Sequence, residues 1–233
     1  MNLTENHAMP TFLPSPATEL RASYPIFEKP EAYERKRSVR NFLDYVRYGF
    51  ERRALRRCLE RTEGVRRVLD VPCGVGRLFS FWREQGLGIL GVDVSPSMAA
   101  AAASALAAGI GAGEVRVGDA FALPLAADEN VDLVACLRFV YYFDEVERKR
   151  LFEEFHRVSK RYLLVQFKDG GTLAERHRAA RRRKRAERRS TKGKLACTRE
   201  TLANELRSAG FRLLSIERVH PLTDRAYALA EKC

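Results

Sequence analysis

The sequence predicts an α/β fold that is Rossmann-like, with seven strands in one mostly parallel sheet, helices on both faces and a helical extension at the N-terminus. Apolar, strand-like segments alternate with helix-like segments along most of the chain, and this alternation favours a parallel sheet. A glycine-rich turn joins the first strand to a helix, and the second strand ends in an acidic residue. The chain has 233 residues, 45% of them hydrophobic, which is enough for one α/β domain with additions.

Apolar runs and local start and stop signals predict the individual elements. Five strands are expected at residues 66–71, 89–93, 114–117, 132–137 and 162–167, and three helices at residues 76–85, 96–108 and 145–158. The residues expected to cap helix N-termini are Ser95, Asp144 and Thr198. Gly210 ends the last helix, and two more strands with a turn between them are expected in residues 211–230.

The N-terminal part and one internal tract differ from the rest of the chain. Residues 1–30 contain five of the nine prolines and little periodicity, so we interpret them as a flexible arm. Residues 31–62 have a helical pattern, and they begin the single domain expected over residues 31–233. Residues 172–196 are expected to be a basic insertion, because eleven Lys and Arg residues accompany a single Glu between residues 176 and 194.

Composition disfavours several classes of protein. No apolar run approaches the roughly 20 residues of a membrane span, and the first residues lack the pattern of a secretory signal. The five cysteines include no Cys-x-x-Cys pair, so neither a disulfide framework nor a metal site is expected. These features favour a cytoplasmic protein. The net charge of +12 comes mostly from the basic insertion, and it suggests anionic partners.

The glycine-rich turn has the chemistry of a nucleoside site. An apolar strand ends at Asp70, Gly74 and Gly76 allow the backbone to approach a ligand closely, and Asp93 follows about 23 residues after Asp70. An acid at this spacing accepts hydrogen bonds from ribose hydroxyls. A dinucleotide site is disfavoured, because Phe79 stands where the third small residue of its fingerprint belongs. No triphosphate-binding loop of the GxxxxGKS/T type occurs.

Four segments in this order resemble the class I S-adenosylmethionine-dependent methyltransferases. They are VLDVPCGVG from residue 68, GVDVSPSM from residue 91, VGDAFALP from residue 117 and VDLVA from residue 131. The chain is similar in particular to small-molecule methyltransferases of the ubiquinone-biosynthesis type. Pro72 replaces the first glycine of the family's first motif, and we expect this to lower cofactor affinity modestly. The resemblance implies S-adenosyl-L-methionine as the cofactor and an antiparallel last strand.

The same resemblance implies a set of cofactor-binding residues at the carboxyl ends of the strands. Asp93 would hold the ribose, and Asp119 would reach the exocyclic amine of the adenine. The whole expected set is Asp70, Pro72, Cys73, Gly74, Gly76, Asp93, Val94, Met98, Asp119, Ala120, Phe121 and Leu137.

Candidates for catalysis and acceptor binding follow the fourth strand. The family often carries a histidine pair there, whereas this chain has Tyr141 and Tyr142. A tyrosine can hydrogen-bond a substrate oxygen, but aromatic residues after a strand are also typical of core packing, so both interpretations stay open. Arg138 could anchor an anionic group or cap the strand. Cys136 stands where RNA cytosine methyltransferases place a nucleophile, but it lacks the proline that precedes that nucleophile, which disfavours covalent catalysis.

The leading hypothesis is a methyltransferase whose acceptor is a small molecule or a lipid-linked compound that carries an anionic group. A phosphorylated, lipopolysaccharide-type glycolipid at the acidic inner membrane surface is one such acceptor. RNA is an alternative that fits the charge, although stacking and amino-methylation motifs are missing. A non-catalytic module of the same fold could instead bind a phosphorylated regulator, such as a cyclic dinucleotide. The basic residues proposed for that contact are Arg181, Arg182, Arg183 and Arg185.

Overall fold

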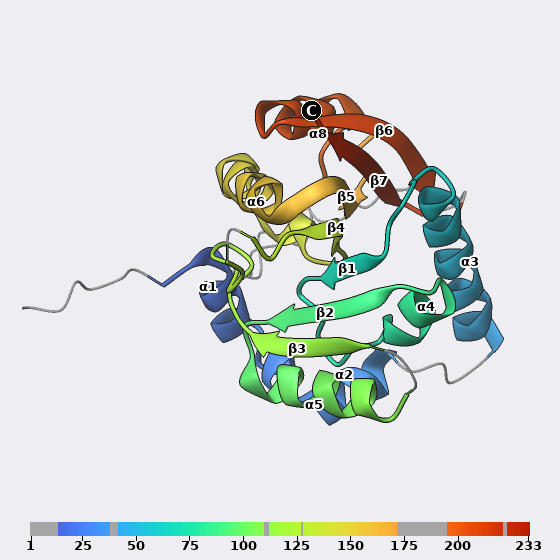
Figure 1. Cartoon of the computed structure of the whole chain (residues 1–233), viewed down its shortest axis with the longest axis vertical. Helices are drawn as coiled ribbons and strands as arrows, with labels where there is room; N and C mark the ends of the chain where they lie inside the picture. The colour runs from blue at the N-terminus through green and yellow to red at the C-terminus, as the bar shows by residue number, and fades with distance from the viewer. Residues whose placement is uncertain (1–13, 38–41, 110–111, 127, 172–194, 221–222) are drawn as a thin grey trace, which may run out of the picture.

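Seven strands form one sheet in the order β3-β2-β1-β4-β5-β7-β6 (Figure 1). They are β1 (Arg67–Asp70), β2 (Gly88–Asp93), β3 (Gly113–Val117), β4 (Val131–Cys136), β5 (Ser159–Lys168), β6 (Phe211–Arg218) and β7 (Arg225–Lys232). The strands from β3 to β5 are parallel, and β7 runs antiparallel between β5 and β6. This arrangement confirms the predicted Rossmann-like sheet. The computed structural model describes residues 14–37, 42–109, 112–126, 128–171, 195–220 and 223–233.

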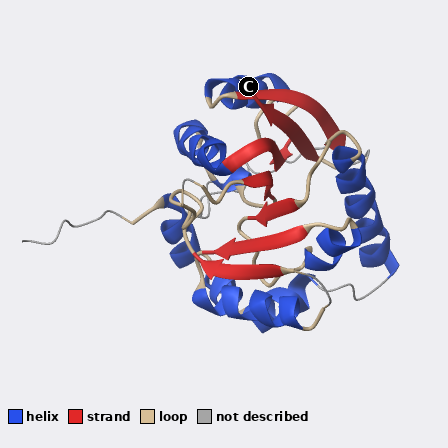
Figure 2. Ribbon diagram, in the orientation of Figure 1, coloured by secondary structure: helices blue, strands red, loops and turns tan. Residues whose placement is uncertain are grey.

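Helices cover both faces of the sheet (Figures 1 and 2). The helical elements are α1 (Pro16–Ser23), η1 (Pro25–Glu28), α2 (Pro30–Arg37), α3 (Phe42–Leu59), α4 (Phe79–Glu84), α5 (Pro96–Ala107), η2 (Val140–Tyr142), α6 (Glu145–Val158) and α8 (Arg199–Ser208). Side chains of α3, α4 and α5 are buried against one face, which includes Val68 and Leu164. Side chains of α1, α6 and α8 are buried against the other face, which includes Val134 and Val165.

Helix boundaries follow the local signals for the most part. The three predicted caps each accept a hydrogen bond from a backbone N–H of the first helical turn, and they are Ser95, Asp144 and Thr198. Helix α6 has the predicted bounds of residues 145–158. Helix α4 is shorter than predicted and begins at Phe79, because Gly76 adopts a φ of 73°, in the left-handed region, and therefore belongs to the preceding turn.

Part of the segment that we interpreted as a flexible arm is helical. Residues 16–28 form α1 and η1, and the Ser15 side chain caps α1 by accepting a hydrogen bond from a backbone N–H. Ala17 and Leu20 are buried in the core. The division of the chain into an arm and one domain stays a prediction. The basic insertion lies outside the described residues from 172 to 194, and so do its arginines Arg181, Arg182, Arg183 and Arg185.

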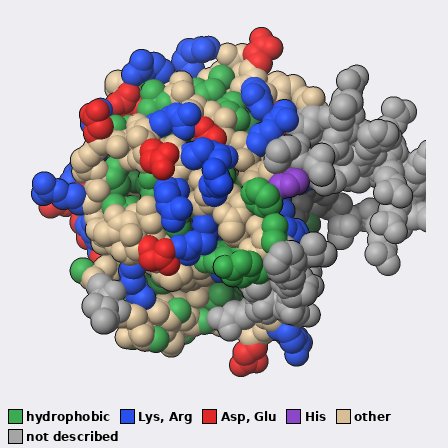
Figure 3. Space-filling view, turned by 90° about the vertical axis from the view of Figure 1, so that its right-hand side faces the viewer, with side chains coloured by type: hydrophobic (Ala, Val, Ile, Leu, Met, Phe, Trp, Pro, Cys, Tyr) green, Lys and Arg blue, Asp and Glu red, His purple; other side chains and the backbone are tan. Residues whose placement is uncertain are grey.

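The face of the molecule that carries α3 displays many Lys and Arg side chains and fewer acidic ones (Figure 3). On α3, Arg52 pairs with Glu84 and Arg57 pairs with Glu217. Arg53 is exposed, and it forms no ion pair within the described part of the chain. Among the described residues we find no helix with the length and hydropathy that a bilayer-spanning segment requires.

Candidate active site

A cavity lies at the carboxyl ends of β1, β2 and β4, where the ligand of an open α/β sheet is expected. The predicted residues in its wall are Pro72, Gly74, Asp93, Val94, Met98, Leu137, Arg138 and Tyr142. The wall also contains residues that we did not predict, namely Ala17, Leu20, Arg21, Tyr33, Ser95 and Phe139. The cavity measures about 70 Å³ with α1 in place. Small-molecule sites usually exceed roughly 300 Å³, so this cavity is small for a ligand of nucleoside size.

The glycine-rich turn and Asp93 form one side of this cavity. Gly74 has a φ of 58°, in the left-handed region that favours glycine. Its N–H donates to Asp93 Oδ2 at 2.8 Å, and the N–H of Ser95 donates to Asp93 Oδ1 at 2.9 Å. Burial raises the pKa of Asp93, while these two donors and the charge of Arg21 act in the opposite direction. The two backbone donors therefore fix the carboxyl group at the cavity wall.

The segment expected at the adenine lies beside the cavity and does not form part of its wall. Asp119, Ala120 and Phe121 are absent from the described lining. The Asp119 carboxylate accepts a hydrogen bond from the N–H of Phe121 at 2.8 Å and another from the hydroxyl of Ser15. A contact of Asp119 with adenine therefore stays a prediction, and it would require the Ser15 hydroxyl to share this carboxylate or leave it.

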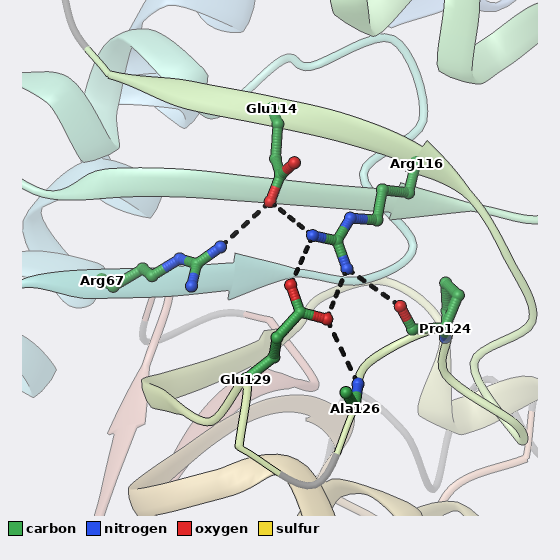
Figure 4. Close-up of polar contacts among 6 residues, drawn as sticks. All are labelled: Arg67, Glu114, Arg116, Pro124, Ala126 and Glu129. Carbon is green, nitrogen blue, oxygen red and sulfur yellow. Dashed lines mark hydrogen bonds and ion pairs between the residues drawn. The ribbon is translucent and has the colours of Figure 1, made fainter.

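An edge cluster of charged residues holds that segment from the outside, and it consists of Arg67, Glu114, Arg116 and Glu129 (Figure 4). Arg116 on β3 donates to the carbonyl oxygen of Pro124 at 3.0 Å and pairs with Glu129 at 2.6 Å. Hydrogen bonding to Arg116 lowers the pKa of Glu129 to about 2. Glu114 contacts both Arg116 and Arg67. These bonds connect Pro124 and Glu129 to the edge of the sheet.

Arg138 and Tyr142 bring polar groups to the cavity from the segment after β4. Arg138 has a φ of 62°, a conformation that costs a residue with a side chain of the order of 1–3 kcal/mol. Its Nη2 donates to both carboxylate oxygens of Glu51, at 2.9 and 3.0 Å. The ring of Tyr142 meets the ring of Tyr24 edge-on, with centroids 5.5 Å apart. A strained, half-buried arginine in a cavity wall is a candidate for a functional role, and that role stays a prediction.

Glu51 on α3 is a central residue that we missed in the sequence. It is 5% exposed, it pairs with Arg77 at 2.9 Å, and it accepts a hydrogen bond from the Tyr227 hydroxyl at 3.2 Å. Burial alone would raise the pKa of Glu51, but the charges of Arg77 and Arg138 outweigh burial and lower this pKa to about 2. One carboxylate thereby joins the loop after β1 to the segment after β4. The available signal was its helical spacing from buried Leu55, which places an acid on an apolar face.

Comparison with known proteins identifies the domain. Residues 68–161 match the sequence profile of a family described as a methyltransferase domain. Residues 68–161 therefore carry the sequence features of a methyltransferase domain. The matched residues run from β1 into β5 and include the turn with Gly74, the Asp93 carboxylate and Arg138. No curated protein matches the sequence significantly.

Solved structures share the fold of this methyltransferase domain. The magnesium protoporphyrin IX methyltransferase of Synechocystis PCC 6803, with bound SAH, is 16% identical, with a TM-score of 0.68 over 90% of this chain and 97% of that chain. A SAM-dependent methyltransferase from Methanosarcina mazei is 19% identical, with a TM-score of 0.59 over 74% and 95%. The cyclase SpnF is 24% identical, with a TM-score of 0.58 over 78% and 80%.

The cavity residues of the methyltransferase domain fit the adenosine part of S-adenosylmethionine. The buried carboxylate of Asp93 can accept hydrogen bonds from ribose hydroxyls. Met98 and Leu137 offer apolar surface for a purine ring. A Cβ at Gly74 would make only an ordinary contact with the ring of Tyr33, 3.8 Å away, so glycine is favoured here by its positive φ and not by lack of space.

Three other predicted cofactor residues of the methyltransferase domain lie outside the described cavity wall. Asp70 is 3% exposed and accepts a hydrogen bond from Trp82 Nε1 at 3.0 Å, and burial raises its pKa to about 7. Cys73 is buried, and its N–H donates to the carbonyl oxygen of Val92 at 2.9 Å. At Gly76 a Cβ would meet the ring of Phe79 at 2.7 Å, so this glycine allows a close turn. Contacts of these residues with the cofactor stay predictions.

Cys136, at the end of β4, and Tyr141, in η2 after it, are both buried, and their burial bears on catalysis. Tyr141 is 4% exposed, belongs to the core cluster and is absent from the described cavity wall, which favours the packing interpretation for this residue. Cys136 is fully buried, and burial raises the pKa of its thiol well above the ordinary value. A thiol that stays protonated is a poor nucleophile, so the structure also disfavours covalent catalysis by Cys136.

Proposed function

We propose that the protein transfers a methyl group from S-adenosylmethionine to a small or lipid-linked acceptor that carries an anionic group. The observation that carries this proposal is the position of Arg138, whose side chain lines the same cavity as Asp93 and Tyr142. When bound, the cofactor supplies a sulfonium methyl group that a nucleophile displaces in line. The protein then contributes orientation and a dry pocket.

Different residues of the cavity orient different parts of the cofactor and of the acceptor. Asp93 orients the ribose, and Arg138 orients the anionic group of the acceptor. The Tyr142 hydroxyl hydrogen-bonds a substrate oxygen at the same cavity wall. Glu51 offsets only one of the two positive charges on Arg77 and Arg138. The cluster of Arg77, Arg138 and Glu51 therefore carries one net positive charge, and an arginine fork suits carboxylates and phosphates.

The proposal places the protein in the cytoplasm. A lipid-linked acceptor would bring it to the acidic inner membrane surface, with residues 172–196 as a second anion-binding edge. The alternatives from the sequence remain as outcomes of the test. RNA would fit the basic insertion, and a non-catalytic role would agree with the general rule that a fold hosts more than one activity.

A labelling experiment tests the acceptor class. The protein is incubated with methyl-labelled S-adenosylmethionine and cell extract separated into lipid, RNA and small-metabolite fractions. We expect label in anionic small molecules or lipids, and a large loss of label in Asp93→Ala with wild-type transfer in Asp128→Ala, an exposed acid away from the cavity. Label confined to RNA would overturn the proposed acceptor. Absence of calorimetric heat with S-adenosylmethionine would overturn methyl transfer itself.

The basic insertion is tested separately. Replacing its four arginines Arg181, Arg182, Arg183 and Arg185 by glutamine removes charge from a segment that we propose to contact the acceptor. We expect weaker acceptor use at unchanged cofactor affinity, and a lower sensitivity of acceptor use to salt. Unchanged turnover would mean that the insertion is only a solvated loop, and binding of a cyclic dinucleotide that depends on these arginines would indicate a regulatory site.

A further inference from the structure

We propose that the acceptor's anionic group occupies a site between α3 and the sheet, formed by Arg138, Arg225 and Gln166, and that it is an oxyanion, either a carboxylate or a phosphate. This inference rests on the proposed function and extends it. Arg138 connects this site to the ligand cavity, because its side chain also lines the cavity that contains Asp93.

Strand register places the other two residues on the face of the sheet that α3 covers. Gln166 on β5 lies opposite Tyr227 on antiparallel β7, and opposed residues of an antiparallel pair project from the same face. Arg225 is two residues before Tyr227, so it also projects from that face. The Tyr227 hydroxyl donates to Glu51 on α3, which identifies the face as the one beneath α3.

Positive charge exceeds negative charge in this region. Arg77 and Arg138 share the single carboxylate of Glu51. The Arg225 guanidinium has neither an ion pair nor a hydrogen bond within the described part of the chain. Burial and the neighbouring charges of Arg138 and Arg47 lower the pKa of Arg225. Three guanidinium groups thus accompany one carboxylate, which leaves two positive charges that the described residues do not offset.

Unsatisfied hydrogen-bonding groups lie in the same region. Gln166 is 0% exposed, and neither its Oε1 nor its Nε2 has a hydrogen-bond partner among the described residues. Arg138 Nε is buried and also lacks a partner there. Buried polar groups without partners are rare, and each of them calls for an explanation. An oxyanion would accept hydrogen bonds from Arg138, Arg225 and the Gln166 amide, and it would offset part of the excess charge.

This arrangement describes the acceptor more closely. Its anionic group would lie on the α3 side of Arg138, while the atom that receives the methyl group would lie in the cavity on the other side. Such an acceptor carries its carboxylate or phosphate at a distance from its nucleophilic atom. Arg138 lies between the two sites, so it selects acceptors in which these two groups have the matching separation.

The test uses the full chain saturated with S-adenosylhomocysteine, with inorganic phosphate and acetate as separate probes at constant ionic strength. We measure the rise in melting temperature with each probe and derive its Kd. In Arg225→Gln we expect an affinity weaker by about tenfold or more. The matched control is Arg53→Gln, an exposed α3 arginine without an ion pair in the described structure, and we expect it to match the wild type. Without a probe, Arg225→Gln should melt no lower than the wild type, because it relieves repulsion with Arg138.

A second variant covers the case in which Arg225→Gln fails to fold. Gln166→Glu adds a carboxylate to the site of Arg138 and the unpaired Arg225, so we expect a higher melting temperature and no further rise with phosphate or acetate. A response to phosphate alone or acetate alone supports the site and identifies the oxyanion. Equal probe affinities in the wild type, Arg53→Gln, Arg225→Gln and Gln166→Glu would overturn it. Failure of the wild type to bind S-adenosylhomocysteine would instead refute the proposed function.

Discussion

Two backbone N–H groups hold the Asp93 carboxyl group at the cavity wall. Asp93→Asn keeps the size of the side chain but removes the charge and one acceptor oxygen. We expect the affinity for S-adenosylhomocysteine, measured by calorimetry, to fall by about tenfold or more, since hydrogen bonds to a charged group are the stronger ones. Asp128→Asn removes an exposed charge elsewhere and should bind like the wild type. Equal affinity of both variants would exclude a ribose contact by Asp93.

Asp70 and Trp82 form a buried pair whose protonation can be observed directly. Burial raises the pKa of Asp70 from 3.8 to about 7. The folded state therefore holds this proton more tightly than the unfolded chain, and the free energy of unfolding falls as the pH rises from 3.8 to about 7. Trp82 is the single tryptophan of the chain, and its Nε1 donates to Asp70. We expect its fluorescence to titrate with a midpoint near pH 7.

Asp70→Asn is the control for this titration. The asparagine oxygen can still accept the hydrogen bond from Trp82, but the side chain no longer ionises. The variant should show neither the fluorescence transition nor the associated loss of stability in urea. A midpoint below about pH 5 in the wild type would mean that Asp70 ionises readily and is hydrated in the folded protein.

The residues of the cavity differ in how far the sequence predicts them. Gly74 and Asp93 were predictable, because backbone chemistry ties them to a fixed spacing after two strands. Glu51 was not, because its partners Arg77, Arg138 and Tyr227 come from three distant parts of the chain. A carboxylate among arginines on a helix is most often solvated, and only the assembled fold shows that this one is buried.

Between elements, one buried ion pair joins α6 to α8. Arg148 Nε lies 2.8 Å from Glu205 Oε2, and Arg148 also donates to the carbonyl oxygen of Phe143 at 2.8 Å. Arg148→Met would leave Glu205 buried without its partner, which should lower the free energy of unfolding by roughly 3–5 kcal/mol. Urea denaturation measures this change.

Two further variants separate the ion pair from the packing around it. Arg150→Met changes an exposed arginine of the same helix and should alter stability by less than about 0.5 kcal/mol. The double variant Arg148→Met, Glu205→Met removes both charges and should be more stable than Arg148→Met alone, because no uncompensated charge remains. If Arg148→Met were as stable as the wild type, the pair would contribute nothing to the contact between these helices.

Elements with strong local signals were predicted closely, and those that depend on distant contacts were not. Helix α6 has a capping box at Asp144 and a clear apolar face, and its bounds are the predicted ones. Helix α1 is only eight residues long and lies in a proline-rich segment, so its pattern favoured an arm. Ala17 and Leu20 stabilise it by burial against other parts of the core, which no local pattern shows.

At the scale of the whole molecule, α1 covers the cavity. Ala17, Leu20 and Arg21 belong to its wall, and Arg21 donates to the carbonyl oxygen of Val94 at 3.1 Å. Removing residues 1–24 should therefore speed both entry and release of S-adenosylhomocysteine, with release faster by about tenfold as contacts are lost. Stopped-flow displacement by a fluorescent adenosine analogue measures the release rate. Removal of residues 1–13, which keeps α1, is the control, and equal release rates from both truncations would contradict a covering role.

The edge cluster of Arg67, Glu114, Arg116 and Glu129 has a consequence for how copies of the protein meet (Figure 4). Strand β3 ends the sheet, so one row of its backbone groups could recruit a strand from another molecule. Glu114 and Arg116 place charges along this strand, and their ion pairs restrain them there. Charged side chains along an edge strand disfavour such pairing. The ion pairs of Glu114 and Arg116, which hold the segment beside the ligand cavity, therefore also disfavour self-association through the β3 edge.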